Sequence, residues 1–326
     1  MQAVVLRTFG AARNLRIEEY PDPRPERGWA AVRLRASALN WHDVLVRQGV
    51  YRSPLPHVIG ADGAGTRTDT GEDVLIVPSL WWGDDESAPG PDWQILGDHR
   101  PGTYAELVRV PTECLVPRPA GLSWAEAAAL PLVGLTSYRA LFTRGRLRAG
   151  ESLLVIGAGG GVATTAVALA TGIGARAVVT SSSAEKIERA RDRGAAGGVL
   201  HTETGWAESA KRLSPGGRGF DLVLDPVGRW SESLRALRPG GRLVVLGASH
   251  AEQASLDVRS FYFGQFDLLG TTLGSLRDFG GLTSLLRSHR IAPPVIDASF
   301  PLDRAAAAHE HLESARGFGK VVLTQD

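Results

Sequence analysis

Hydrophobic and polar positions follow two different patterns along the chain, and the pattern changes near residue 121. Before it, short apolar runs are separated by proline and glycine, as at Ala3–Leu6, Ala30–Leu34, Val74–Val77 and Leu107–Val110. Apolar runs with turn residues between them are typical of strands. We therefore predict a mainly β domain in this part, with an irregular surface lobe over Pro78–Gly102.

From Ser123 onward, strands and helices are predicted in alternation. Ser123 and Glu126 have the spacing of a capping box that opens an alanine-rich helix. Strands are expected at Ser152–Ile156, Ala177–Thr180, Phe220–Leu224, Arg242–Leu246 and Lys320–Leu323, and helices at about Val162–Thr171, Ala184–Arg193 and Leu302–Ser314. Strand–helix–strand units at this spacing build a parallel sheet with helices on its faces.

A glycine-rich turn joins the strand at Ser152–Ile156 to the helix that follows. Glycines let the backbone approach a pyrophosphate, and a helix N-terminus offers N–H donors. The six-residue form G-x-G-x-x-G is not met, because Val162 takes its last position, but the seven-residue form Gly157-x-x-Gly160-x-x-Ala163 is. We predict a dinucleotide site formed by Gly157, Gly159, Gly160, Gly161 and Val162; the alternative is a turn that binds nothing.

The end of the next strand indicates which dinucleotide is bound. Sites selective for NAD place an acidic residue there, about 20 residues on, to hold the ribose hydroxyls. Here the strand ends in Ser181, Ser182 and Ser183, and Lys186 follows. Hydroxyls and an ammonium can bind a 2′-phosphate that an acid would repel. We predict NADPH (NADP⁺) rather than NADH; the serines can equally cap the next helix, and both roles are compatible.

Composition excludes several classes of function. The 36 basic and 35 acidic residues give a net charge of +1, so neither nucleic acid nor a membrane surface is expected as a partner. The single cysteine, Cys114, cannot form an internal disulfide. No apolar run is long enough to span a bilayer, and the N-terminus lacks a signal-peptide core. We expect a cytoplasmic protein with a small-molecule substrate.

Motifs in a fixed order resemble the medium-chain dehydrogenase/reductase superfamily, and within it the quinone oxidoreductase-like group. Besides the glycine turn they are Asn40-x-x-Asp43-x-x-x-Arg47-x-Gly49-x-Tyr51, Gly102-Thr-Tyr-Ala-Glu106, Gly134-Leu-Thr136-Ser-Tyr138, Asp225-Pro-Val-Gly228, Pro239-Gly-Gly-Arg242 and Gly319-Lys320-Val-Val-Leu323. The resemblance implies an α/β chain: a GroES-like, mainly β catalytic domain over 1–121 and 292–326, a Rossmann NAD(P)-binding domain over 122–291, a substrate cleft at their junction, and a homodimer.

The residues that bind zinc in many members of this superfamily are missing here. By the resemblance, the three catalytic ligand positions carry Asn40, Ala61 and Leu132, and the four cysteines of the structural zinc lobe are absent from 78–97. We therefore predict a protein without zinc. His42, His57, Asp62 and His99 could form a different metal site, but single surface histidines more often have structural roles. We expect Trp81, Trp82 and Trp93 to supply the packing that a metal supplies in relatives.

Without zinc, a carbonyl oxygen has no Lewis acid, so a quinone or a conjugated enone or enoyl compound is the expected hydride acceptor. Two alternatives are a tailoring reductase or dehydrogenase of one specialised metabolite and a non-catalytic, NADPH-binding sensor. The resemblance implies Asn40 and Tyr51 as hydrogen-bond donors, Thr136 beside the nicotinamide, and His42 as a proton donor. An internal Asn40–Asp43 pair and simple cleft packing of Tyr51 are the alternatives.

Further cofactor contacts are predicted from strand ends and from the resemblance. Asp225, Val227 and Gly247 lie where strands end, at the edge where open α/β sheets bind ligands. Thr271 and Leu273 resemble a segment near the nicotinamide and the dimer interface, and Lys320 resembles a basic residue that contacts the cofactor. Two of only three lysines, Lys186 and Lys320, thus belong to cofactor motifs.

Overall fold

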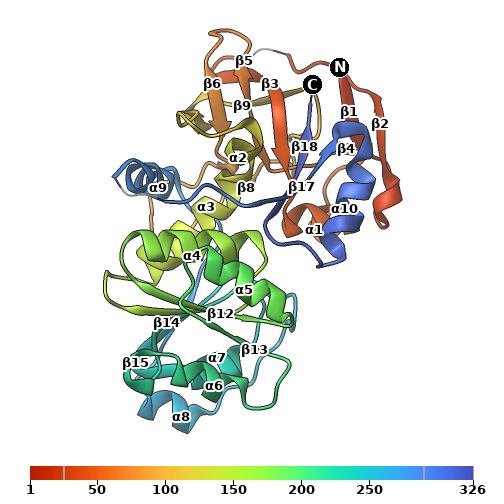
Figure 1. Cartoon of the computed structure of the whole chain (residues 1–326). Coiled ribbons are helices and arrows are strands. Elements are labelled where there is room, and N and C mark those ends of the chain that lie inside the picture. Colours follow the sequence, from red (N-terminus) through yellow and green to blue (C-terminus); the bar gives the residue numbers. More distant parts are fainter. Residues whose placement is uncertain (25, 289–290, 326) are drawn as a thin grey trace. The chain divides into compact units, whose positions relative to one another are not determined.

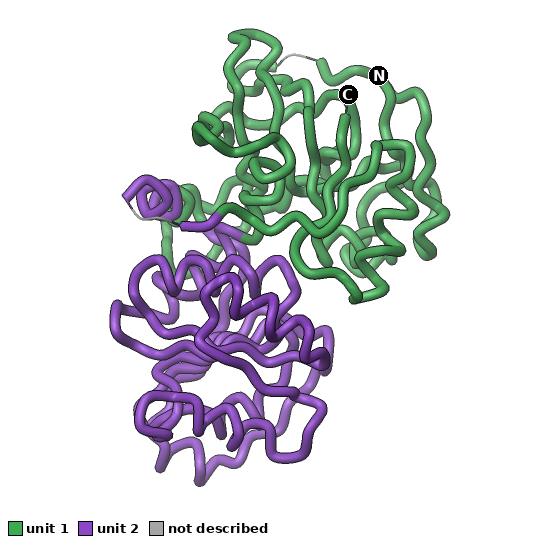
Figure 2. Tube along the Cα trace, viewed as in Figure 1, with its two compact units in different colours: residues 1–133, 275–279, 293–326 green, residues 134–274, 280–292 purple. Residues whose placement is uncertain are grey.

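The computed structural model describes residues 1–24, 26–288 and 291–325 and divides into two compact units, coloured separately in Figure 2. The first unit comprises 1–133, 275–279 and 293–326, and the second comprises 134–274 and 280–292. The predicted limit at 121 differs from the observed one at 133 because α2 (Trp124–Ala129) packs against strands of the first unit. The first unit also takes residues 275–279, which the prediction placed in the second domain.

The first unit is built mainly on two β-sheets, and a two-stranded pairing lies in its irregular lobe (Figure 1). The larger sheet has the order β10-β6-β5-β3-β18-β17, and β9 also pairs with β3. All its pairings are antiparallel except β17 with β18. A smaller sheet has the order β2-β1-β4. The strands are β1 (Gln2–Leu6), β2 (Leu15–Glu19), β3 (Trp29–Ala38), β4 (His57–Val58), β5 (Asp62–Arg67), β6 (Asp73–Ile76), β9 (Leu107–Pro111), β10 (Leu115–Pro117), β17 (Ile296–Pro301) and β18 (Lys320–Thr324).

Helix α1 (Trp41–Gln48) lies within this predicted β region and was not expected. The backbone N–H of Asn40 donates to Asp43 Oδ2 at 2.8 Å at its start, and Gly49 ends it with φ of 86°. Eight residues give only two helical turns, too few for a periodic apolar pattern to be recognised. A further helix of this unit, α10 (Ala305–Glu313), follows a short 3-10 turn at Leu302–Arg304, so the predicted helix is confirmed in its main part.

The irregular lobe contains only a two-stranded pairing, β7 (Ser79–Leu80) with β8 (Gln94–Ile95), and is held largely by tryptophans. Trp82 and Trp93 meet edge to face at 5.7 Å between ring centroids. Trp93 Nε1 donates to Ser79 Oγ at 2.9 Å. Trp81 packs on Trp29 at 5.9 Å. The expectation that these tryptophans supply the packing of the lobe agrees with these contacts.

The second unit is a six-stranded parallel sheet with the order β13-β12-β11-β14-β15-β16. Helices α4 and α5 cover one face and α6 and α7 the other (Figure 1). Numbered within the unit, this order is 3-2-1-4-5-6, the doubly wound order of dinucleotide-binding folds. The predicted α/β fold class is confirmed. The elements are β11 (Ser152–Val155), α4 (Gly161–Gly172), β12 (Arg176–Ser181), α5 (Ala184–Asp192), β13 (Gly198–Leu200), α6 (Trp206–Arg212), β14 (Phe220–Asp225), α7 (Trp230–Arg235), β15 (Leu237–Val245), α8 (Val258–Phe263) and β16 (Asp267–Gly270).

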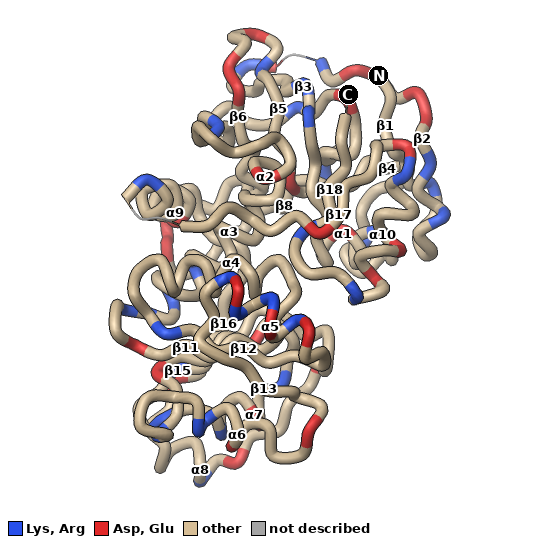
Figure 3. The backbone as a smooth tube through the Cα atoms, viewed as in Figure 1, with Lys and Arg blue, Asp and Glu red and all other residues tan. Residues whose placement is uncertain are grey.

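Two further elements each have residues in both units. Helix α3 (Pro131–Tyr138) continues into a π-helix at Arg139–Arg144, and α9 spans Leu276–Ser288. In the described part of the chain, no helix combines the length and apolar character that crossing a membrane requires. Basic and acidic residues are interspersed along both units (Figure 3).

Candidate functional site

The glycine turn between β11 and α4 offers room for a phosphate group. Gly157 has φ of +104°, a conformation that side chains other than glycine rarely adopt. A Cβ added at Gly157 or at Gly160 would meet no described atom within 4 Å. Gly160 is the N-cap of the twelve-residue α4 and brings no side-chain acceptor for its first N–H groups. Open space, free donors and a helix N-terminus fit the pyrophosphate of a dinucleotide.

The end of β12 carries the predicted hydroxyls, most of which have local partners. Ser181 Oγ accepts from Ser183 N at 3.1 Å, and Ser183 Oγ accepts from Lys186 N at 3.4 Å as the N-cap of α5. The capping alternative is therefore confirmed for Ser183. Ser182 is exposed. Thr180, not singled out from the sequence, accepts from Gly157 N at 3.0 Å and ties the strand end to the glycine turn.

The remaining predicted cofactor residues of this unit also lie at strand ends. Asp225 is fully buried, and its carboxylate accepts from Val227 N at 2.9 Å, Gly228 N at 2.8 Å and Ser233 Oγ at 3.0 Å. Its observed role is to hold the loop after β14. Gly247 follows β15, and a Cβ there would lie 2.1 Å from the Pro226 carbonyl oxygen, so only glycine fits.

Thr271, Leu273 and Thr136 complete the predicted set in the second unit. Thr271 N donates to Val245 O at 3.0 Å just after β16, and Leu273 is buried. Thr136 is buried on α3, whose next residue, Ser137, donates from Oγ to Val162 O at 3.3 Å. That bond places this part of α3 against the first turn of α4.

In the first unit, a buried carboxylate connects Asn40 and Leu132, two of the three positions at which the resemblance expects zinc ligands. Asp62 is 0% exposed. Its Oδ2 accepts from Asn40 Nδ2 at 2.9 Å and its Oδ1 from Leu132 N at 2.7 Å. Lys320 Nζ lies 3.2 Å from Oδ2 and also donates to Asn40 Oδ1 at 2.5 Å and Leu39 O at 2.6 Å. We call Asp62, Asn40, Lys320 and the Leu132 N–H the Asp62 network.

The Asp62 network uses the donors that were predicted to face substrate and cofactor. The second N–H of the Asn40 amide donates to Ala38 O at 3.3 Å, so both have acceptors. An ammonium has three N–H donors, and Lys320 has three acceptors. The predicted donor role of Asn40 and cofactor contact of Lys320 each need a free N–H, which this structure does not leave them. The alternative of an internal Asn40–Asp43 pair is confirmed.

From the sequence, Asp62 was expected only as a possible metal ligand, and its pairing with Lys320 was not expected. The signal available was an acid inside Gly60-Ala61-Asp62 and a lysine in a chain with three lysines. The two residues are 258 positions apart, so only the fold pairs them. Within the described residues, no three His, Cys, Asp or Glu side chains converge as metal ligands.

His42 and Tyr51 lie against each other, with ring centroids 4.7 Å apart. Burial lowers the pKa of His42 to about 4, so the ring is neutral at pH 7 and has no imidazolium proton to donate. This corrects the predicted proton-donor role. Tyr51 is 39% exposed, and burial, followed by the charge of Asp98, raises its pKa. The phenol therefore keeps its proton and can donate a hydrogen bond.

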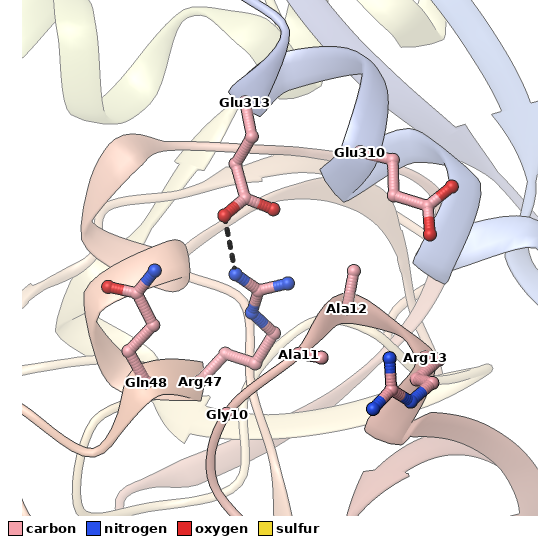
Figure 4. A pocket seen from close by; sticks show the side chains of 8 residues that line it. All are labelled: Gly10, Ala11, Ala12, Arg13, Arg47, Gln48, Glu310 and Glu313. Atoms are coloured by element: carbon pink, nitrogen blue, oxygen red, sulfur yellow. Dashed lines mark hydrogen bonds and ion pairs between the residues drawn. The ribbon is translucent and has the colours of Figure 1, made fainter.

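A depression of about 520 Å³ lies elsewhere in the first unit (Figure 4). Arg47, 2% exposed, is the buried charge in its wall and pairs with Glu313 at 2.7 Å. Its Nε and Nη1 have no hydrogen-bond partner in the part of the chain that the structure describes. The lining residues are Gly10, Ala11, Ala12, Arg13, Arg47, Gln48, Glu310 and Glu313. None of the predicted site residues is among them.

Comparisons with known proteins agree with this architecture. Residues 161–288 match the zinc-binding dehydrogenase family, and residues 26–120 match the alcohol dehydrogenase GroES-like domain. A zinc-type alcohol dehydrogenase-like protein of Schizosaccharomyces pombe is 31% identical over 96% of each chain. Quinone oxidoreductase of Rattus norvegicus is 28% identical over 99% of this chain and 97% of its own. A solved structure named NAD-dependent alcohol dehydrogenase is 38% identical, covers 100% of both chains and has a TM-score of 0.93.

The glycine turn, the parallel sheet in doubly wound order and the GroES-like unit occur together in one chain. Relatives that match it nearly end to end include an alcohol dehydrogenase-like protein and a quinone oxidoreductase. The chain therefore belongs to the medium-chain dehydrogenase/reductase superfamily of oxidoreductases.

Proposed function

We propose that this protein is an NADPH-dependent reductase that transfers hydride to a quinone or a conjugated enone or enoyl acceptor without a catalytic metal. The observation that carries the proposal is the Asp62 network. Two of the three positions that hold zinc ligands in relatives, Asn40 and Leu132, instead bond to one carboxylate, which Lys320 neutralises. The third, Ala61, has no ligand atom.

An acceptor in such a site must be activated by its own conjugation. Hydride adds to an electrophilic carbon, and the electron pair displaced from the conjugated system comes to rest on an oxygen. When bound, the reduced nicotinamide supplies that hydride. Tyr51 is the donor we assign to the oxygen, because its raised pKa keeps the phenol protonated. The neutral His42 ring packs against Tyr51 and orients it. A proton from water completes the reduction.

The residues of the second unit fit a dinucleotide. The turn at 157–160 has open space and faces the N-terminus of α4. The preference for NADPH rests on the absence of an acid at the end of β12, in Thr180–Ser183. Because one similar structure is named NAD-dependent, the two dinucleotides should be titrated side by side.

The test is oxidation of NADPH with a panel of quinones, enones and enoyl thioesters, with and without a metal chelator. We expect turnover that the chelator leaves unchanged and no stoichiometric zinc in native mass spectrometry. Oxidation of simple alcohols that is lost with the chelator would overturn the proposal. Tight NADPH binding with no oxidation by any acceptor would favour a sensor. Turnover confined to one complex metabolite would favour a tailoring enzyme.

The role of Tyr51 has its own test. Removing one donor to a developing oxyanion costs on the order of 10²–10³ in kcat. We therefore expect Tyr51→Phe to lower kcat on the order of 10²-fold, with little change in NADPH affinity. Tyr262→Phe is the matched control, because Tyr262 is 50% exposed on α8 of the second unit. Equal activity of both variants would remove Tyr51 from the mechanism.

We also propose that the protein forms a homodimer, as the resemblance to the superfamily implies. Size-exclusion chromatography with light scattering distinguishes a dimer from a single chain.

A further inference from the structure

Three basic side chains lie at or just beyond the carboxyl ends of three strands of the parallel sheet in the second unit. His201 follows β13, Arg229 follows the Asp225–Gly228 loop after β14, and His250 lies beyond the end of β15. In a parallel sheet these ends share one edge, which is also the edge of the glycine turn. We call His201, Arg229 and His250 the basic cluster.

Hydrogen bonds fix His201 beside the glycine turn. Its backbone N–H donates to Ser181 O at 2.9 Å. Its Nδ1 lies 3.1 Å from Thr180 Oγ1, which accepts from Gly157 N at 3.0 Å. The Thr180 side chain thus connects the His201 ring to the glycine turn. The ring lies next to the strand end where NADPH and NADH must be distinguished. Among the described residues, Nε2 has no hydrogen-bond partner and is not buried.

The other two members lie on two loops, after β14 and after β15, that a backbone hydrogen bond joins. His250 N donates to Val227 O at 2.7 Å, and Arg229 lies two residues after Val227. The charges of Arg229 and His250 both act on the His201 ring. In the described part of the chain, none of the three side chains forms an ion pair with an acid. A cluster of basic groups without a counter-ion is suited to an anion.

Asp225, at the end of β14, does not neutralise the cluster, because its carboxylate already bonds to Val227 N, Gly228 N and Ser233 Oγ. The elements packed against β13 bring charges of both signs: Glu185 and Lys186 on α5, Glu208 and Lys211 on α6, and Glu203 in the turn after β13. Burial is the largest cause that lowers the pKa of His201, followed by the positive charges of Arg229 and His250. The ring is therefore neutral in the free protein at neutral pH.

We propose that the basic cluster binds the 2′-phosphate of NADPH and that His201 takes up one proton as it does so. The proton comes from solvent. In the complex, Nε2–H donates to a phosphate oxygen and Nδ1–H to Thr180 Oγ1, whose hydroxyl hydrogen turns away. This deepens the proposed NADPH function and rests on it. It adds charged donors to the hydroxyl donors of Ser181 and Ser183, whose oxygens only accept in their printed local bonds.

A pH dependence follows with a definite sign. Phosphate favours the protonated ring, so the pKa of His201 is higher in the complex than in the free protein. The added affinity is present at low pH and is lost as pH rises through the pKa of the complex. Below about pH 6 the phosphate itself gains a proton, which weakens binding again. NADH lacks this phosphate, so its affinity should not follow this curve.

The experiment is calorimetric titration of the full chain with NADPH and with NADH at pH 6.2 and pH 8.2, each in two buffers of different ionisation enthalpy. We expect NADPH affinity to fall about tenfold between the two pH values, as for a shift of about one pKa unit. We expect net proton uptake with NADPH near neutral pH and none with NADH. NADPH binding without proton uptake, at an affinity independent of pH, would overturn the inference.

Variants identify the residues. His201→Gln should remove the proton uptake and the pH dependence for NADPH and leave NADH affinity unchanged. Arg229→Gln should weaken NADPH on the order of tenfold at both pH values and leave NADH unchanged, which tests the cluster even if the His201 variant does not fold. Arg235→Gln, on the exposed side of α7, is the matched control. Equal losses for both dinucleotides would show a merely structural role and overturn the inference.

The outcome also separates this inference from the proposed function. If NADPH binds and is oxidised by an enone but no proton is taken up, only the basic cluster is wrong. If neither dinucleotide binds, both proposals fail.

Discussion

Replacing Lys320 by methionine tests the Asp62 network directly. The change keeps most of the side-chain volume but removes the ammonium, which is 4% exposed, from three oxygens. It leaves the fully buried Asp62 carboxylate with only the donors of Asn40 and Leu132. Removing one partner of a buried ion pair costs about 3–5 kcal/mol, because an unpaired charge stays buried. For a domain of this size, that corresponds to a fall in Tm of roughly 6–20 °C.

The loss should depend on pH. Burial raises the pKa of Asp62, and Lys320 is the largest opposing influence, so the pKa rises further without it. When the pKa of a carboxyl is higher in the folded state than in the unfolded state, the protein loses stability as pH increases. Lys320→Met should therefore be more destabilising at pH 8 than at pH 5. Thermal and urea unfolding followed by circular dichroism measure both effects.

Two further variants complete this test. Asp62→Asn combined with Lys320→Met removes both charges and should recover most of the lost free energy of unfolding. Lys211→Met changes a half-buried lysine on α6 and should cost no more than about 0.5 kcal/mol. A loss below about 1 kcal/mol in Lys320→Met, or no recovery in the double variant, would refute the reasoning, since neither fits a buried ion pair.

Three other predictions concern single contacts. Burial raises the pKa of Asp43 to about 7, so the folded state holds this proton more tightly than the unfolded state does. The protein therefore loses stability as pH rises from about 4 to about 7. Asp43→Asn should remove this loss, which urea unfolding of the variant and the wild type across this pH range would show. Gly157→Ala should lower the free energy of unfolding by about 1–3 kcal/mol, because φ of +104° strains a residue with a side chain. Gly160→Ala, at φ of −75°, should leave the stability of the protein unchanged but weaken dinucleotide binding. Equal stabilities of the two variants would contradict this. Trp93→Phe deletes the donor to Ser79 Oγ and should cost about 1 kcal/mol in thermal unfolding, and an unchanged Tm would show that the bond contributes nothing.

Local sequence patterns predicted the second unit well because its signals are local. The run Ser152–Ile156, the glycines after it and the small-residue helix define a strand, a turn and a helix without reference to distant residues. The capping box at Ser123 is equally local, with Glu126 Oε2 accepting from Ser123 N at 2.8 Å. Helix α1 escaped prediction because eight residues give too little periodicity.

The features of the candidate site also fall into those that residue identity determines and those that depend on the tertiary structure. The sequence by itself determined the glycines of the turn at 157–160, the residues Asn40, Ala61 and Leu132 where the resemblance expects zinc ligands, and the absence of an acid within 180–183, because each depends only on residue identity. Only the tertiary structure decided what those positions do. It paired Lys320 with Asp62 across 258 residues, used both amide hydrogens of Asn40, and brought His201 against Thr180. The physical reason is that burial and hydrogen-bond partners set the protonation and availability of a side chain, and both arise only when distant segments pack together.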